Sequence, residues 1–151
     1  MIIEPKIRFV EKSDLEDLVR LCELHAIFEE CEYNSESKKQ KLNDHLFCEK
    51  PTLYCLVVEY LDEIIGYSTY MKQFSTWDSD FYIYMDCLFM TEKSRSLGIG
   101  KKLIDEIKTQ AKKMNCDLIQ WQTPDFNTKA MKFYKKIGGV SKTKERYFLK
   151  V

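Results

Sequence analysis

Residues 94–103, SRSLGIGKKL, place two glycines and two lysines directly before a segment with the pattern of an amphipathic helix. The start of a helix carries partial positive charge, which repels lysine side chains. An anion bound at this turn would therefore account for Lys101 and Lys102. Gly98 and Gly100 would let the backbone approach such a ligand, with free N–H groups facing a phosphate. The alternative is a plain glycine turn with solvated lysines, and the stretch alone leaves both open.

The spacing of the glycines distinguishes three phosphate-binding motifs. A Walker A loop needs four residues between its first glycine and a Gly-Lys-Ser/Thr run, which the residues from Gly98 onward do not provide. A dinucleotide fingerprint needs a third glycine at position 103, where Leu103 stands. The pattern that remains is R-x-x-G-x-G, formed by Arg95, Gly98 and Gly100. In this arrangement the free amides at the helix start would face a pyrophosphate.

Asp86 interrupts the apolar run 81–90, FYIYMDCLFM. A carboxylate there is either buried with a raised pKa or turned toward a cleft, and a hydrogen-bonded structural acid is the alternative. Cys87 beside it could suggest a thiol nucleophile, but neither histidine, His25 or His45, lies near it in the sequence. We interpret both histidines as local surface or core residues rather than ligands.

A second group of acids ends the first predicted helix, in the stretch HAIFEECEY. Glu29, Glu30 and Glu32 there form either a solvated helix end or a source of negative potential that attracts a cation. Asp78 could add to that potential, and Trp77 could lie against an ammonium group. These residues make a cationic amine one candidate ligand.

Apolar periodicity predicts the elements that position these residues. In chain order we expect a strand at 6–10, a helix from Ser13, a helix at about 36–48, strands at 53–60, 64–74 and 81–90, a helix after Gly100, a strand at 116–123, a helix from Asn127 to Ile137, and a last strand at 146–150. Ser13 and Glu16 match a capping box, Asn127 is a suitable N-cap, and Gly138 a suitable stop. The order β-α-α-β-β-β-α-β-α-β predicts one α/β (α+β) domain over 1–151, mostly antiparallel with a βαβ crossover.

The composition excludes several classes of protein. The 151 residues carry 24 basic and 24 acidic side chains, so no general attraction to nucleic acid or an anionic membrane is expected. No apolar run approaches the roughly 20 residues that span a bilayer, and no signal peptide is visible. The six cysteines form no C-x-x-C pair, which favours a reducing cytoplasm over disulfides or a zinc ribbon, and no metal site is expected.

Two segments resemble the GNAT acetyltransferases, a family that uses acetyl-CoA. R-x-x-G-x-G after a strong strand resembles the family's motif A, and NTKAMKFYKKIGG matches its N-x-x-A-x-x-F-Y-x-x-x-G signature. The resemblance covers essentially the whole chain and implies a mixed, six- to seven-stranded GNAT sheet with flanking helices. Within the family, YCLVVEY, FSTWD, YMDCLFMTEKSRSLGIG and KFYKKIGG look most like the spermidine/spermine (diamine) and thialysine N-acetyltransferases. Asp86 replaces their glutamate, and Ser96 replaces the usual first glycine.

The resemblance implies roles for individual residues. The strand before the glycine turn is splayed in this family, and its free backbone N–H groups bind pantetheine and the acetyl oxygen. The implied acetyl-CoA contacts are Leu88, Phe89, Met90, Arg95, Ser96, Leu97, Gly98, Ile99, Gly100, Lys101, Asn127, Ala130 and Tyr134. Phe28-Glu29 matches an aromatic–glutamate pair that contacts polyamines, and the position of Asp86 faces the substrate amine.

The chemistry implied is direct acetyl transfer to an amine. An amine with a pKa of about 10.4 must lose a proton before it attacks, to Asp86 or Glu29, directly or through water. Tyr134, matched to the family's general acid, would protonate the leaving thiolate; without the motif, an aromatic pair with Phe133 on a core face would be the commoner interpretation.

We therefore expect an acetyl-CoA-dependent N-acetyltransferase that acts on a diamine, a polyamine or a lysine-like amino acid. The alternatives are a protein or peptide amine acetyltransferase and a non-catalytic acyl-CoA sensor. The family also implies a homodimer, with the last strands as one place for its interface.

Overall fold

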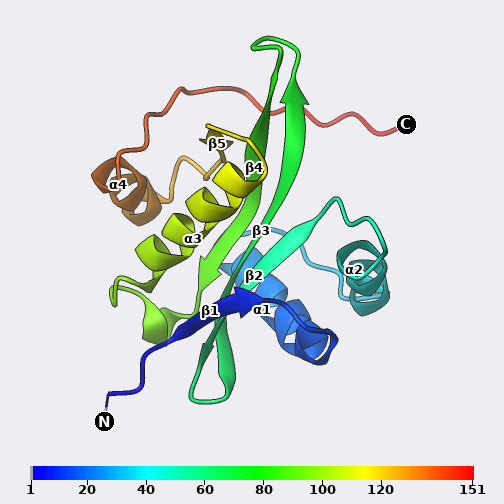
Figure 1. The fold of residues 1–151 in the computed structure, drawn as a ribbon, viewed down its shortest axis with the longest axis vertical. Helices are drawn as coiled ribbons and strands as arrows, with labels where there is room; N and C mark the ends of the chain where they lie inside the picture. The colour runs from blue at the N-terminus through cyan, green and yellow to red at the C-terminus, as the bar shows by residue number, and fades with distance from the viewer. Residues whose placement is uncertain (1) are drawn as a thin grey trace.

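The computed structural model describes residues 2–151, within which one five-stranded sheet runs in the order β1-β2-β3-β4-β5 (Figure 1). Neighbouring strands pair antiparallel from β1 to β4, and β5 pairs parallel to β4. The strands are β1 (Lys6–Phe9), β2 (Tyr54–Tyr60), β3 (Glu63–Ser75), β4 (Asp80–Met90) and β5 (Ile119–Gln120). The helices are α1 (Leu15–Phe28), α2 (Lys38–Leu46), α3 (Ile99–Lys113) and α4 (Thr128–Lys136). The predicted α/β class, the order of the elements as far as α4 and the βαβ crossover through α3 are confirmed.

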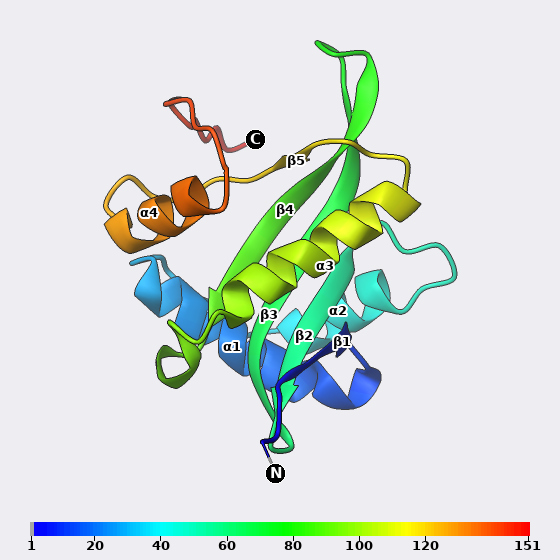
Figure 2. The same cartoon turned by 60° about the vertical axis from the view of Figure 1, so that its left-hand side comes forward.

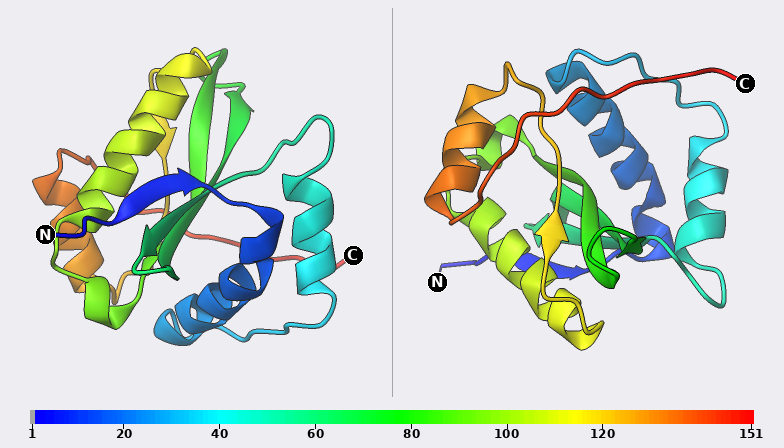
Figure 3. Two further views of the ribbon diagram at one scale, coloured as in Figure 1. Left: turned by 60° about the horizontal axis from the view of Figure 1, so that its bottom comes forward. Right: turned by 90° about the horizontal axis from the view of Figure 1, so that it is seen from above.

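The sheet separates two apolar cores. Alternate residues of β2 divide between them, because successive side chains of a strand point to opposite faces. Cys55 and Val57 pack with the buried leucines of α1 and α2, whereas Leu56 and Val58 pack with the apolar face of α3. Figure 3 shows α3 on one side of the sheet and α1 and α2 on the other.

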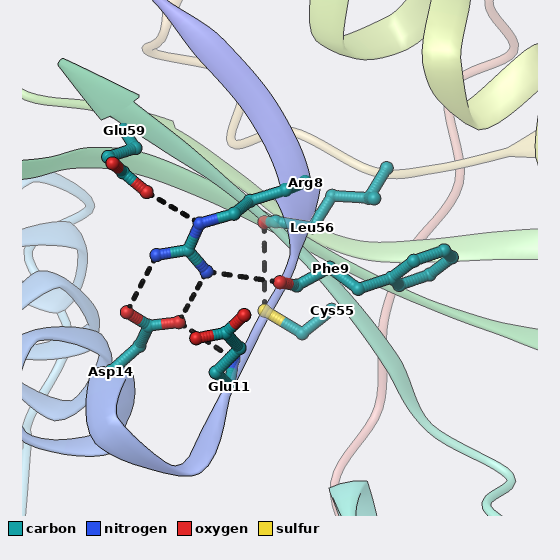
Figure 4. A network of polar contacts seen from close by, with 7 residues as sticks. All are labelled: Arg8, Phe9, Glu11, Asp14, Cys55, Leu56 and Glu59. Carbon is teal, nitrogen blue, oxygen red and sulfur yellow. Dashed lines mark hydrogen bonds and ion pairs between the residues drawn. The ribbon is translucent and has the colours of Figure 1, made fainter.

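The start of α1 is fixed by an ion-pair network rather than by the predicted capping box. The Arg8 guanidinium donates to both carboxylate oxygens of Asp14, at 2.7 and 3.0 Å, and to Glu59 at 2.6 Å (Figure 4). The Glu11 N–H also donates to Asp14, at 2.7 Å. These bonds hold a 3-10 turn over Lys12–Asp14, and α1 begins only at Leu15. The capping box predicted at Ser13 is therefore wrong, because its position lies inside that turn.

The sheet has fewer strands than the resemblance implied. The strand expected at 116–123 is reduced to the two residues of β5, and within residues 2–151 no strand forms at 146–150. Tyr147, Phe148 and Leu149 are instead exposed on an extended tail. An isolated segment has no neighbour for its backbone hydrogen bonds, so a strand-like sequence pattern alone does not make a strand.

A β-bulge at Asp86 exchanges the faces of the sheet to which the following side chains of β4 point. Thr69 pairs with Cys87 and Tyr70 with Met85, so Asp86 has no partner on β3. Before the bulge, Met85 packs in the α3 core; after it, Cys87 packs in the α1 core. Successive side chains of a strand point to opposite faces of the sheet, so one extra residue moves every later side chain of the strand to the other face.

The helices of residues 2–151 include none that is both long and apolar enough to cross a membrane.

Candidate active site

The last part of β4 lacks a neighbour on one side. β5 pairs with β4 only at Ile83 and Tyr84, and over residues 85–90 the described chain pairs with β4 only through β3. Figure 2 shows β5 meeting β4 far from the end that leads into α3. The predicted splay is present, and it leaves one backbone edge of Leu88, Phe89 and Met90 without a strand partner.

Asp86 lies at the start of this unpaired edge. Its side chain is exposed, so the interpretation as a buried acid is wrong, and the bulge directs the carboxylate away from both cores. The neighbouring Cys87 thiol donates to an Asp86 oxygen at 3.8 Å. Burial raises the pKa of Cys87 to about 12, so it stays a thiol at neutral pH and is a poor nucleophile.

The glycine turn connects β4 to α3. Ser96 has a φ of 67° and Gly98 a φ of 75°, and α3 begins at Ile99 with Gly98 as its N-cap. Within residues 2–151, the backbone N–H groups of 96–101 donate to no backbone acceptor. A row of free amides at the start of a 15-residue helix is a geometry that binds phosphate.

The two lysines of the turn have protein partners of their own. Lys101 pairs with Asp105 at 2.6 Å and Lys102 with Glu4 at 3.3 Å, and all four side chains are exposed. The lysines therefore need no bound anion to explain them, and the case for a phosphate site rests on the backbone.

Arg95 joins the turn to the end of α1. Its guanidinium lies 4.3 Å from the ring centre of Phe28 and 5.4 Å from that of Phe89. Its Nε donates to the Met90 carbonyl at 3.0 Å. This contact brings Phe28 and Glu29, at the end of α1, to the last residues of β4.

Glu29 belongs to a hydrogen-bonded chain that the sequence analysis did not predict. His25 Nε2 lies 3.1 Å from Glu29 Oε1, and His25 Nδ1 lies 2.9 Å from the Tyr67 hydroxyl. The His25 ring stacks on Phe89 with centroids 5.1 Å apart. The i,i+4 spacing of His25 and Glu29 was the available signal, but nothing in the sequence links either residue to β3.

Tyr134 is held on α4 by features that the sequence predicted. Asn127 caps the helix by accepting the Ala130 N–H at 3.3 Å, and Gly138, with a φ of 97°, ends it. The Tyr134 ring packs edge-on against Trp121, with centroids 5.1 Å apart. Burial, followed by the negative charge of Glu29, raises the pKa of Tyr134 to about 12.

Trp77 lies apart from this cluster. Its side chain is 97% exposed in the turn between β3 and β4, where Asp78 accepts a hydrogen bond from Ser75. The glycine turn follows the opposite end of β4, a strand of 11 residues that spans roughly 35 Å at about 3.3 Å per residue. The structure thus brings Glu29, Arg95 and Tyr134 to one end of β4, and Trp77 to the other. Across residues 2–151, no three His, Cys, Asp or Glu side chains are grouped to hold a metal ion.

A family model described as Acetyltransferase (GNAT) family matches residues 19–139. The chain belongs to the GNAT acetyltransferase family. The predicted family and the assignment as an N-acetyltransferase are confirmed. This GNAT chain is 27% identical over 152 residues to the thialysine N-epsilon-acetyltransferase of Mus musculus, with 95% of this chain and 89% of the relative covered.

Two further comparisons differ in extent. The D-amino-acid N-acetyltransferase HPA3 of Saccharomyces cerevisiae is 29% identical over 75 residues, covering 50% of this GNAT chain and 47% of the relative. The aminoglycoside N-acetyltransferase AAC(6')-Iy, solved in complex with CoA, superposes with a TM-score of 0.83 at 16% identity, over 99% of this chain and 97% of that one. The second likeness shows the fold alone, and it agrees with the predicted GNAT fold.

Proposed function

We propose that this GNAT chain transfers an acetyl group from acetyl-CoA to the primary amine of a small cationic substrate: a diamine, a polyamine or a lysine-like amino acid. The observation that carries the proposal is that Glu29 and Tyr134, from opposite ends of the sequence, belong to elements that meet near the unpaired edge of β4: Arg95 joins the end of α1 to Met90, and Phe133, beside Tyr134, lies against the Gly100 position. Aminolysis of a thioester needs a proton acceptor and a proton donor together, and these two side chains supply both.

The proposed reaction is a direct transfer in a ternary complex. The substrate ammonium loses a proton to Glu29 or Asp86, directly or through water. The neutral nitrogen attacks the carbonyl carbon and the C–N bond forms. The C–S bond then breaks, and the new amide nitrogen gives its second proton to water. The thiolate takes a proton from Tyr134, whose pKa of about 12 keeps that proton in place at neutral pH. The Tyr134 phenolate is afterwards reprotonated from water.

The acetyl-CoA contacts follow from free backbone groups. The amides of 96–101 suit the pyrophosphate, and the unpaired edge at Leu88, Phe89 and Met90 suits pantetheine and the acetyl oxygen. Arg95 adds positive charge at the turn, and Asn127 and Ala130 stand at the start of α4. Gly98 suits close approach, because no atom lies within 4 Å of where a Cβ would stand.

The acidic side chains favour a cationic amine. Phe28, Glu29 and Asp86 would supply negative charge and an aromatic ring at the proposed amine position, from which Trp77 in the β3–β4 turn is distant. The likeness to a thialysine N-epsilon-acetyltransferase supports an amine at the end of a lysine-like side chain.

We also propose a homodimer in a reducing cytoplasm. The exposed Tyr147, Phe148 and Leu149 form an apolar tail that would pair as a strand with a second copy, and six free cysteines accord with a reducing compartment. Light scattering on the wild type and on Phe148→Glu tests the dimer, which the charge should weaken. A monomeric wild type would contradict it.

A thiol-release assay with acetyl-CoA tests the proposed function over polyamines, lysine analogues, aminoglycosides and peptides. We expect release with polyamines or lysine-like amines. Release with peptides alone would favour a peptide acetyltransferase, and coenzyme binding without release would favour a sensor. Comparing Glu29→Gln with Asp86→Asn identifies the base, because each change removes one carboxylate and keeps the side-chain length.

A further inference from the structure

His25 joins three elements through one ring. It lies on α1 with its side chain 12% exposed, contacts Tyr67 of β3 through Nδ1, and contacts Glu29 through Nε2. Its ring lies flat on Phe89 of β4, at an interplanar angle of 21°. A ring with both nitrogens engaged and one face covered has a single favourable orientation.

The partners of His25 fix the direction of its hydrogen bonds. Burial raises the pKa of Tyr67 far above its usual range, so the hydroxyl keeps its proton. An ionised Glu29 can only accept, so the neutral ring must carry its proton on Nε2. Nδ1 then accepts from the Tyr67 hydroxyl. The chain runs from Tyr67 O–H to His25 Nδ1, and from His25 Nε2–H to Glu29.

The same chain accommodates a second protonation state without a change of rotamer. When Nδ1 also carries a proton, it donates to the Tyr67 oxygen, and the hydroxyl can turn to the Cys22 or Cys87 sulfur, both of which lie against it. Both ring nitrogens keep a partner in either state.

Glu29 needs such a partner because of where it stands. It is the C-cap of α1, and a carboxylate at the C-terminal end of a helix is unfavourable against the helix dipole. The next residue, Glu30, has a φ of 56°, so the chain leaves the helix there. With 29% of its side chain exposed, Glu29 would turn toward solvent if the His25 ring did not hold it.

We propose that His25 is a positioning residue, which directs the Glu29 carboxylate at the substrate amine through a bond oriented by Tyr67. The inference rests on the proposed function. The charged and titratable groups that face this chain are Cys22 and Glu29 from α1, Tyr67 from β3, Cys87 from β4, Arg95 across Phe89, and Tyr134 from α4.

The deciding experiment is the pH profile of kcat/KM for His25 variants with the best amine. His25→Leu should lower kcat/KM roughly 10- to 100-fold, the range for a lost hydrogen bond to a charged group. It should also move the acid limb of the profile to higher pH, because the carboxylate form loses its hydrogen-bond donor. A merely structural role would lower the whole profile without moving the limb.

Two conservative variants separate the two ring nitrogens. In His25→Gln, the side-chain amide can take the place of Nε2, which faces Glu29. In His25→Asn, the shorter amide can take only the place of Nδ1, which faces Tyr67. His25→Gln should therefore recover part of the activity and of the acid limb, and His25→Asn should not. His45→Leu is the matched control: it removes the other histidine, which is exposed on α2, and should leave the profile unchanged.

Nitrogen-15 NMR of the His25 ring in the unliganded protein tests the chain without turnover, and it applies even if His25→Leu fails to fold. We expect the Nε2–H tautomer for the neutral ring. An Nδ1–H tautomer, an acid limb unmoved in His25→Leu, or a His25→Gln variant that recovers no more than His25→Asn would overturn the role of His25 and leave the proposed function standing. A wild type that releases no thiol with any amine would instead overturn the proposed function.

Discussion

The proposed coenzyme site and the proposed amine site differ in the groups that form them: backbone amides in the first and side chains in the second. The proposed coenzyme side is the turn 95–101, and the groups that would bind there are the free backbone amides of 96–101. The amine side is assembled from side chains of α1, β3 and β4 that meet through His25 and Phe89. A backbone site tolerates changes of side chain: Ser96 adopts a φ of 67° where the family usually has glycine. A side-chain site changes with each residue, so we expect specificity for the amine to reside there.

The largest effect should come from Tyr134, the proposed general acid. Tyr134→Phe should lower turnover by roughly 100-fold or more, because the leaving thiolate loses its proton donor. The Kd for acetyl-CoA, measured by calorimetry, should change little. Tyr147→Phe is the matched control, since that tyrosine is 88% exposed on the tail. Equal turnover in the two variants would refute the acid role.

The pH dependence of turnover tests the acid role of Tyr134 in a second way. With a pKa of about 12, Tyr134 stays protonated at pH 10, whereas an ordinary tyrosine would be half ionised there. Turnover should therefore not decline between pH 8 and pH 10 through loss of this proton. A decline in the wild type, with an apparent pKa near 10 that is absent from Tyr134→Phe, would contradict the assignment.

Gly100→Ala tests the coenzyme side alone. A Cβ at this position would lie 3.5 Å from Phe133, an ordinary contact, and alanine favours a helix over glycine by about 0.5–1 kcal/mol. Thermal stability should hold or rise, while the Kd for acetyl-CoA rises roughly 10-fold because the methyl group stands beside the amides.

Gly139→Ala provides the contrast, because its Cβ would lie 2.9 Å from the Tyr134 carbonyl oxygen. That variant should lose about 1–3 kcal/mol of stability. An unchanged Kd in Gly100→Ala would mean that the turn does not bind the coenzyme.

Arg8→Met tests how far the amine side depends on the anchoring of α1. It should cost about 2–3 kcal/mol in urea unfolding at pH 7, because Asp14 is left buried without its partner. The Arg8 hydrogen bonds hold the pKa of Asp14 below its usual range, so this stabilisation is present above about pH 4 and is lost as the pH falls further.

The difference in the free energy of unfolding between wild type and Arg8→Met should therefore be smaller at pH 3 than at pH 7. Arg20→Met is the control. The Arg20 side chain is 50% exposed, so this substitution should change the free energy of unfolding by less than about 0.5 kcal/mol. A difference that is constant with pH would show that Asp14 is not the group involved.

The smallest effect should come from Trp77→Ala. Its side chain lies at the far end of β4 from the glycine turn, so stability should change by less than about 0.5 kcal/mol and the KM for the amine by less than about twofold. Trp121→Ala, at the only other tryptophan, should lower turnover by removing the packing of Tyr134. A large rise in KM for Trp77→Ala would show that the hairpin reaches the amine, as the sequence suggested.

The coenzyme side was predictable because its signals are local. The glycine spacing, the Asn127 cap and the Gly138 stop each act within one turn of chain, and the structure has each of them in place. The amine side was not, because the interpretation of His25 as a local histidine had no means of including Tyr67, 42 positions away. The bulge at Asp86 and the 3-10 turn before α1 were missed for the same reason: each is set by a partner distant in sequence.

By itself, the sequence determined the family, the order of the elements as far as α4 and the turn that would hold a coenzyme, since periodicity and turn chemistry are properties of neighbouring residues. Only the tertiary structure decided that Asp86 is exposed by a bulge, that β4 and β5 part after two pairs, and that residues 146–150 form no strand within the described chain. Those outcomes depend on which backbone groups find partners across the sheet, and a strand cannot supply its own neighbour.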